Sequence, residues 1–106
     1  MNETTRDPEA IHPELPETAV PMRREGYHLD KIPCCVVLQN ESNQNVLVLN
    51  ETGALIWRLC NGDINVGSMI DMVCESYPVS RDDVVRDVNR SLDTFRIYEL
   101  VDIKGA

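Results

Sequence analysis

Four cysteines and two histidines are the residues of this 106-residue chain that could most readily bind a metal or act as nucleophiles. They are Cys34, Cys35, Cys60, Cys74, His12 and His28. Their spacing contains no C-x-x-C motif and no paired histidines, so it does not match a zinc site. The adjacent Cys34 and Cys35 would point to opposite faces of a strand. In a reducing compartment we expect free, mostly buried thiols, with a redox or metal role as the alternative.

Arrangements typical of catalysis are also missing from the sequence. Neither His12 nor His28 is combined with a serine, cysteine or carboxylate in a recognisable nucleophile pattern. Gly53 and Gly62 are isolated, so they do not form a glycine-rich phosphate loop. We therefore expect no catalytic residue, no metal, no cofactor and no enzymatic activity.

Four aspartates and four arginines lie between residues 81 and 96. They are Arg81, Asp82, Asp83, Arg86, Asp87, Arg90, Asp93 and Arg96. Paired carboxylates would need a concave site for acid–base catalysis, and nothing in the sequence indicates one. We expect a solvated helix face of mixed charge, with intrahelical pairs such as Asp82–Arg86.

The composition describes one small acidic domain. The formal net charge is -8, and 42% of the residues are apolar, which is enough for a modest core. An acidic protein is poorly suited to nucleic-acid phosphates and is compatible with a basic or neutral partner. No apolar run approaches the ~20 residues of a membrane span, and residues 1–7 lack the apolar segment of a signal peptide. We expect a cytoplasmic protein without membrane contact.

Residues 1–25 differ in composition from the rest of the chain. Four prolines interrupt helices and strand ladders there, and acidic residues outnumber basic ones. We expect a disordered or extended arm, followed by a folded domain at residues 26–106. The alternative is that Ala19–Met22 lies in a groove of the domain or of a partner.

Three short segments after the arm have the patterns of strands. Tyr27–Ile32 alternates apolar and polar residues, and Pro33 ends it. Cys34–Leu38 is a continuous apolar run typical of a central strand, and Val46–Leu49 is a third strand. Together they predict a small antiparallel meander, which needs a helix on one face to be stable.

Three helical segments follow the strands. Asn50 is expected to cap a helix at about residues 51–60 that buries Trp57, and Gly62 is expected to end it. A second helix is predicted at residues 66–77, and a third begins after the cap residue Ser80. Residues 100–103 are expected to form a short closing strand or loop. The prediction is an α+β fold of winged-helix type, with a three-stranded meander followed by three helices.

Residues 27–103 resemble the PqqD-like family, whose members recognise ribosomally made precursor peptides. The most specific segment is Leu49–Trp57, which reads L-N-E-T-G-A-L-I-W. Further matching segments are Gly62-Asp63, Glu75-Ser76-Tyr77, Asp87-Val88 and Tyr98-Glu99-Leu100-Val101. The resemblance implies a peptide chaperone that binds a leader segment and presents the precursor to a modifying enzyme, typically a radical S-adenosylmethionine enzyme. The product would be a peptide natural product or a cofactor of the pyrroloquinoline quinone type.

The resemblance also implies where the leader binds. In the family the leader adds beside the third strand and lies against the third helix, which corresponds here to Val46, Leu47, Val48 and Leu49. On a helical wheel centred on Val88, one shoulder of the third helix carries Val85, Asn89 and Arg96. The other shoulder carries Ser91 and Tyr98. We expect the shoulder of Val85, Asn89 and Arg96 to face the peptide.

Two other functions remain open from the sequence. A winged helix can bind DNA through its last helix, although the balanced charge of this helix disfavours that role. An exposed edge strand could also pair with a second copy, so that the chain acts as an assembly subunit and forms a homodimer.

Overall fold

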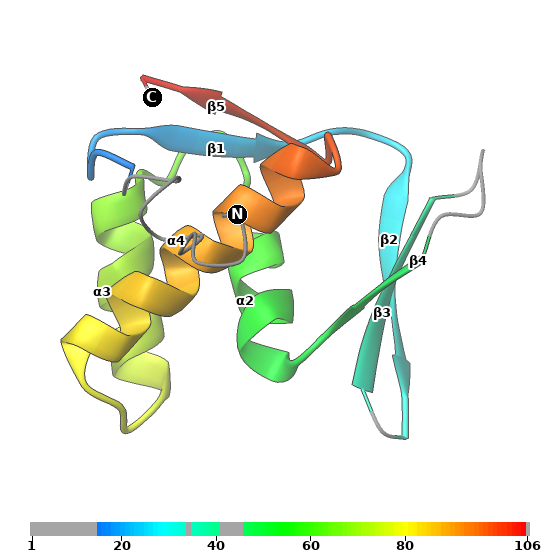
Figure 1. Ribbon diagram of the computed structural model, residues 1–106, viewed down its shortest axis with the longest axis horizontal. Coiled ribbons are helices and arrows are strands. Elements are labelled where there is room, and N and C mark those ends of the chain that lie inside the picture. The colour runs from blue at the N-terminus through cyan, green and yellow to red at the C-terminus, as the bar shows by residue number, and fades with distance from the viewer. Residues whose placement is uncertain (1–14, 34, 41–45, 106) are drawn as a thin grey trace, which may run out of the picture.

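The computed structural model describes residues 15–33, 35–40 and 46–105. Helices cover one face of a three-stranded sheet, and a two-stranded ribbon lies above them (Figure 1). In chain order the elements are β1 (Val20–Arg23), β2 (Tyr27–Ile32), β3 (Cys35–Asn40), β4 (Val46–Leu49), α2 (Glu51–Leu59), α3 (Val66–Ser76), α4 (Arg81–Ile97) and β5 (Val101–Lys104). The predicted three-stranded antiparallel sheet followed by three helices is confirmed.

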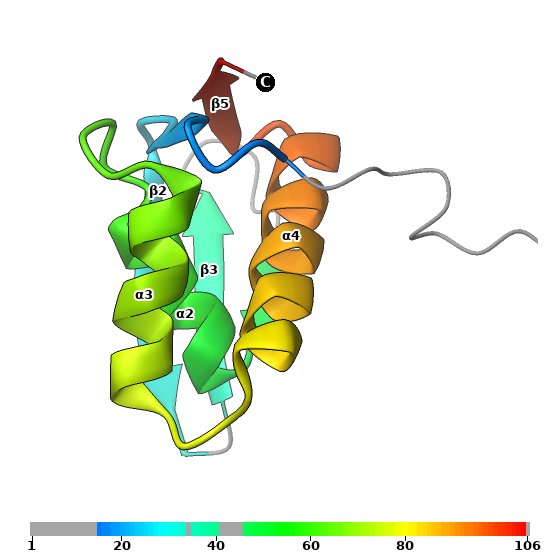
Figure 2. The same ribbon diagram turned by 90° about the vertical axis from the view of Figure 1, so that its left-hand side faces the viewer.

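The larger sheet has the order β2-β3-β4 and is antiparallel throughout. Leu29, Leu38 and Leu47 lie side by side across it, so they share the face that meets the helices. Figure 2 shows the three helices in front of that face. The observed bounds of β2 and β4 match the predicted segments. The middle strand begins at Cys35, and Cys34 lies outside the described residues.

Helix α2 begins as predicted and ends earlier than predicted. The Oδ1 atom of Asn50 accepts a hydrogen bond from the backbone N–H of Gly53 at 2.7 Å, which confirms the N-cap. Gly62 does not end the helix, because Cys60 is already the C-cap and its N–H donates to the carbonyl of Trp57. Gly62 instead lies in the following turn at a φ of 85°, a conformation that favours glycine.

The later helices have side-chain caps and apolar stripes. Asn65 caps α3 and Ser80 caps α4 through bonds of 2.8 and 3.1 Å to backbone N–H groups. The predicted buried stripe of α4 is confirmed: it consists of Val84, Val88, Leu92 and Phe95. One ion pair differs from the prediction, since Arg86 binds Asp83 at 2.8 Å, an acid one residue nearer in sequence than the predicted Asp82.

Trp57 is at the centre of the core, as expected for the largest apolar side chain. Its ring contacts Tyr27 of β2 edge-on at a centroid distance of 6.1 Å and Phe95 of α4 at 5.2 Å. These contacts join the sheet to α2 and α4. Aromatic packing therefore contributes to the position of α4 relative to the sheet.

Part of the segment that composition assigns to the arm packs on the domain. Strand β1 pairs antiparallel with β5, with Val20 opposite Lys104 and Arg23 opposite Val101. Ala19 is 0% exposed, and Pro21 is fully buried. The alternative from the sequence placed Ala19–Met22 in a groove of the domain or of a partner, whereas the structure has Val20–Arg23 as a strand paired with β5.

The same segment also provides hydrogen bonds to helix ends. The N–H groups of Val66 and Gly67, which have no partner inside α3, donate to the carbonyls of Ala19 and Glu17. At the other end of the core, Arg23 Nη1 donates to the carbonyls of Trp57 and Arg58 at 3.2 and 2.6 Å. These bonds connect the segment to α2 and α3 at the points where the helices need partners.

Candidate functional site

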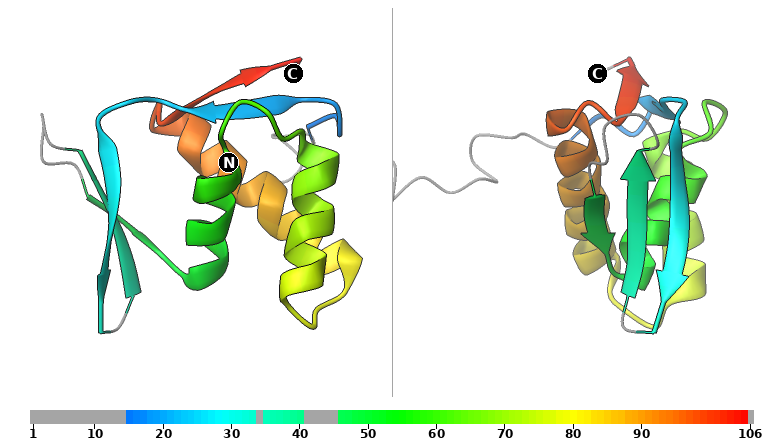
Figure 3. Two further views of the ribbon diagram at one scale, coloured as in Figure 1. Left: turned by 180° about the vertical axis from the view of Figure 1, so that it is seen from behind. Right: turned by 90° about the vertical axis from the view of Figure 1, so that its right-hand side faces the viewer.

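Strand β4 lies at the edge of the sheet, beside α4 (Figure 3). In the described part of the chain, its outer edge pairs with no further strand. Val46 and Val48 point to the uncovered face and are 58% and 62% exposed. Leu47 and Leu49 point toward the helices and pack on the core. The edge therefore presents free backbone groups, and apolar side chains flank it on both faces.

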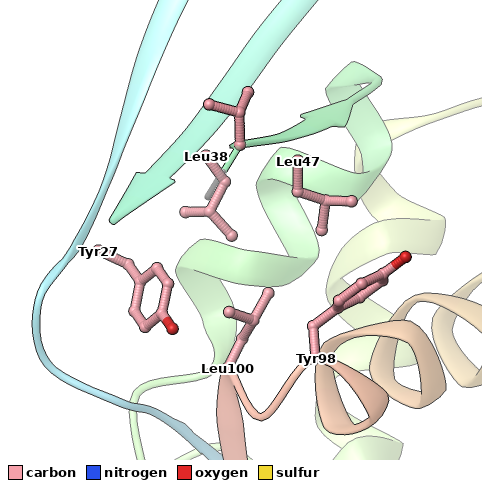
Figure 4. A pocket seen from close by; sticks show the side chains of 6 residues that line it. Tyr27, Leu38, Leu47, Tyr98 and Leu100 are labelled. Carbon is pink, nitrogen blue, oxygen red and sulfur yellow. The ribbon is translucent and has the colours of Figure 1, made fainter. Parts of the chain in front are cut away.

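An open pocket of about 190 Å³ lies at this edge. Its lining residues come from β2, β3, β4 and the turn after α4, and are Tyr27, Leu38, Val46, Leu47, Tyr98 and Leu100. Figure 4 shows the rings of Tyr27 and Tyr98 on either side of the leucines. The lining side chains are aliphatic or aromatic, and the phenol groups of the two tyrosines are their polar groups. Such a lining suits an apolar side chain better than a charged one.

The turn after α4 positions two of these residues. Glu99 adopts a φ of 59°, in the left-handed region. Its N–H donates to the carbonyl of Arg96, and the N–H of Leu100 donates to the carbonyl of Phe95 at 2.7 Å. This is a Schellman motif, with Glu99 where glycine is usual. It turns Leu100 into the core beside Phe95, while Tyr98 remains 61% exposed at the pocket wall.

The expected site residues fall into two groups. Val46 and Leu47 line the pocket, and Val48 and Leu49 continue the same strand beyond it. Val85, Asn89 and Arg96 do not line the pocket. Of the two shoulders of α4, the one that reaches the pocket is the shoulder with Tyr98.

Asn89 has a different partner. Its Oδ1 atom accepts a hydrogen bond from the N–H of Leu15 at 2.8 Å, and its Nδ2 atom donates to the carbonyl of Val85. Val85 packs against the core, and Arg96 binds Asp93 at 2.9 Å. This shoulder therefore faces the segment that precedes β1.

Charged and sulfur groups near the site have structural partners. Arg24 binds Glu99 at 3.5 Å and Asp102 at 2.9 Å, and the hydrogen bond from Arg24 lowers the pKa of Asp102. Burial raises the pKa of the Cys60 thiol to about 12, against an opposing effect of Arg23. The thiol Sγ lies 3.2 Å from the carbonyl of Ile56, to which it donates. A thiol with this pKa is not a nucleophile at neutral pH.

Neither a metal-binding cluster nor a membrane-spanning helix is found in the described part of the chain. Residues 15–33, 35–40 and 46–105 contain no group of three or more His, Cys, Asp or Glu side chains that could hold a metal ion. Over the same ranges, each helix is too short or too polar to cross a membrane.

Comparisons with known proteins agree with this geometry. The family model described as coenzyme PQQ synthesis protein D (PqqD) matches residues 34–101. The solved structure of TbiB1 in complex with the TbiA(beta) leader peptide has a similar fold, with a TM-score of 0.63 and 25% sequence identity. The match covers 80% of this chain and 96% of that chain. A search of curated proteins found no match.

Proposed function

The chain belongs to the PqqD family, whose model matches residues 34–101, and we propose that it binds the leader segment of a ribosomally made precursor peptide. The leader adds as a strand beside β4 and lies between β4 and α4. The remainder of the precursor stays free for a modifying enzyme. The observation that carries this proposal is the apolar pocket of about 190 Å³ at the open edge of β4.

Strand addition suits this edge for two reasons. Backbone groups of an edge strand give affinity for any extended peptide, and adjacent side-chain pockets give selectivity. Here both lie together, because Leu47 and Tyr98 line the pocket from the two sides of the gap between β4 and α4. The similar TbiB1 structure was solved with a leader peptide, which supports the same class of ligand.

We place the helical wall of the site on the shoulder of α4 that includes Ser91 and Tyr98. From the sequence we had expected the shoulder of Val85, Asn89 and Arg96 instead. In this proposal Asn89 has a structural role, since it holds the backbone of Leu15. On β4, the four residues Val46–Leu49 remain the proposed peptide contacts.

The proposed role is recognition and presentation without chemistry on the peptide. The Cys60 thiol is protonated and buried, which supports a structural role for this residue. The partner that acts on the bound precursor is proposed to be a radical S-adenosylmethionine enzyme, because that is the pairing implied by the family resemblance. A homodimer through β4 would compete with the leader for the same edge.

An amide NMR titration tests the proposal. The probe is a synthetic leader peptide of a precursor encoded beside this gene, and a scrambled peptide of the same composition is the control. We expect shifts to concentrate in β4 and at Tyr98 and Leu100, with smaller shifts in β2, which forms the opposite edge of the sheet. Dilution of the free protein without peptide identifies any dimer, because dimer contacts shift with protein concentration.

The proposal fails if leader and scrambled peptide give the same shifts, or if neither gives any. Shifts that concentrate in β2 would also contradict it, since they would place the peptide on the wrong edge.

A further inference from the structure

The side chains on the face of α4 that includes Tyr98 change in chemical type along the helix. Tyr98 lines the pocket, and residues 4, 7 and 11 positions earlier lie on the same face of an α-helix. These residues are Thr94, Ser91 and Asp87. Thr94 and Ser91 are half-buried, and Asp87 is exposed. The wall therefore runs from an aromatic end through two hydroxyls to a carboxylate.

Among the acids of α4, Asp87 lies closest in angle around the helix to Tyr98, Thr94 and Ser91. The Asp83 carboxylate accepts a hydrogen bond from Arg86 at 2.8 Å, so it is already engaged. Among the described residues, no ion pair to Asp87 is formed. Arg90 lies three residues after Asp87, about 60° farther round the helix and away from Tyr98.

We propose that this protein selects leader peptides that combine an apolar anchor with a basic residue, and that Asp87 is the specificity-determining residue for the basic position. This inference rests on the proposed function. The apolar anchor enters the pocket beside Tyr98, a small or polar residue passes Ser91 and Thr94, and the basic residue faces Asp87. The net charge of -8 on the whole chain also favours a basic ligand over an acidic one.

The spacing of the two leader residues follows from helix and strand geometry. Tyr98 and Asp87 are separated by 11 positions, or about 16 Å along α4. An extended peptide advances about 3.3 Å per residue, so about five residues span this distance. Side chains on one face of a strand are an even number of positions apart. We therefore expect the basic residue about four or six positions from the anchor.

Selection from a displayed library of random 12-residue peptides tests the inference on the full chain. We expect peptides with an aromatic or aliphatic residue and Lys or Arg four or six positions away. The variant Asp87→Asn should reduce the preference for the basic residue by about two- to fivefold, the range for an exposed ion pair. The matched control is Asp82→Asn, which removes an exposed acid from the opposite shoulder of the same helix and should leave the preference unchanged.

The possible failures are distinguishable. Peptides with an apolar anchor but no basic preference, or with the same preference in the Asp87→Asn variant, overturn this inference and leave the proposed function standing. An acidic preference also overturns it and assigns the position to Arg90. Selection that enriches no peptide contradicts the proposed function itself.

A second measurement uses the peptides that the selection enriches. They are resynthesised with Gln in place of Lys or Arg, and this change should weaken binding to the native protein but not to the Asp87→Asn variant.

Discussion

Replacement of Tyr98 by alanine tests the pocket directly. The ring forms one wall of the pocket at the end of α4, and it contacts solvent over 61% of its surface. Because the side chain is mostly exposed, its removal should affect peptide binding much more than folding. The neighbouring Ile97 is 60% exposed and does not line the pocket, so Ile97→Ala is a matched control.

The size of the effect follows from the area that the peptide covers. A tyrosine has about 200 Å² of surface, and 61% of it is roughly 120 Å². If the leader covers about half of that area, about 60 Å² leaves water, which is worth about 1.5 kcal/mol at 25 cal/mol per Å². Tyr98→Ala should therefore weaken leader binding about tenfold. Ile97→Ala should change it by less than about twofold.

Fluorescence anisotropy with a labelled leader peptide measures both affinities, and thermal unfolding shows that both variants fold. Equal losses for the two variants, or an unchanged affinity for Tyr98→Ala, would refute the assignment of this shoulder of α4 to the peptide groove. Loss of folding in one variant would be visible in the unfolding curve, and Tyr98→Leu then provides a smaller change at the same wall.

Three further results are expected. Glu99→Gly should stabilise the protein by about 1 kcal/mol, or roughly 5 °C in Tm, because glycine removes the cost of the left-handed conformation while the lost ion pair to Arg24 is exposed; an unchanged or lower Tm would contradict this. A chain that starts at residue 26 should be less stable in urea by more than about 3 kcal/mol than one that starts at residue 15, since it loses β1 and the bonds to α3; equal midpoints would show that β1 is dispensable. The raised pKa of Cys60 means that the thiol ionises first in the unfolded chain. Its contribution to the unfolding free energy should therefore be constant below about pH 9 and fall above it by at most about 1.4 kcal/mol per pH unit. The Cys60→Ala variant should lack this component of the fall, and a slope identical to that of the native protein would contradict the assignment.

Much of the fold could be predicted because its patterns are local. The alternation in Tyr27–Ile32 and the cap at Asn50 depend on neighbours in sequence, and both are present in the structure. Strand β1 could not be predicted in the same way. It contains a proline and pairs with a strand about 80 residues later, so no local pattern specifies it.

The candidate site could be predicted in part for a similar reason. The edge position of β4 follows from the order of the strands along the chain. The sequence does not show which shoulder of α4 faces the edge of β4, because both shoulders flank the same apolar stripe on a helical wheel. That choice depends on Leu15, which occupies one shoulder, and on the turn at Glu99, which has no glycine to mark it.

The most direct test of the central claim is a search for cross-strand contacts between a bound leader peptide and β4. In a complex of perdeuterated protein with unlabelled leader peptide, nuclear Overhauser effects report which amides lie near peptide protons. We predict a ladder of contacts from peptide backbone protons to the amides of Val46–Leu49, in a continuous strand register. Contacts confined to side chains, or a ladder on β2, would contradict strand addition at this edge.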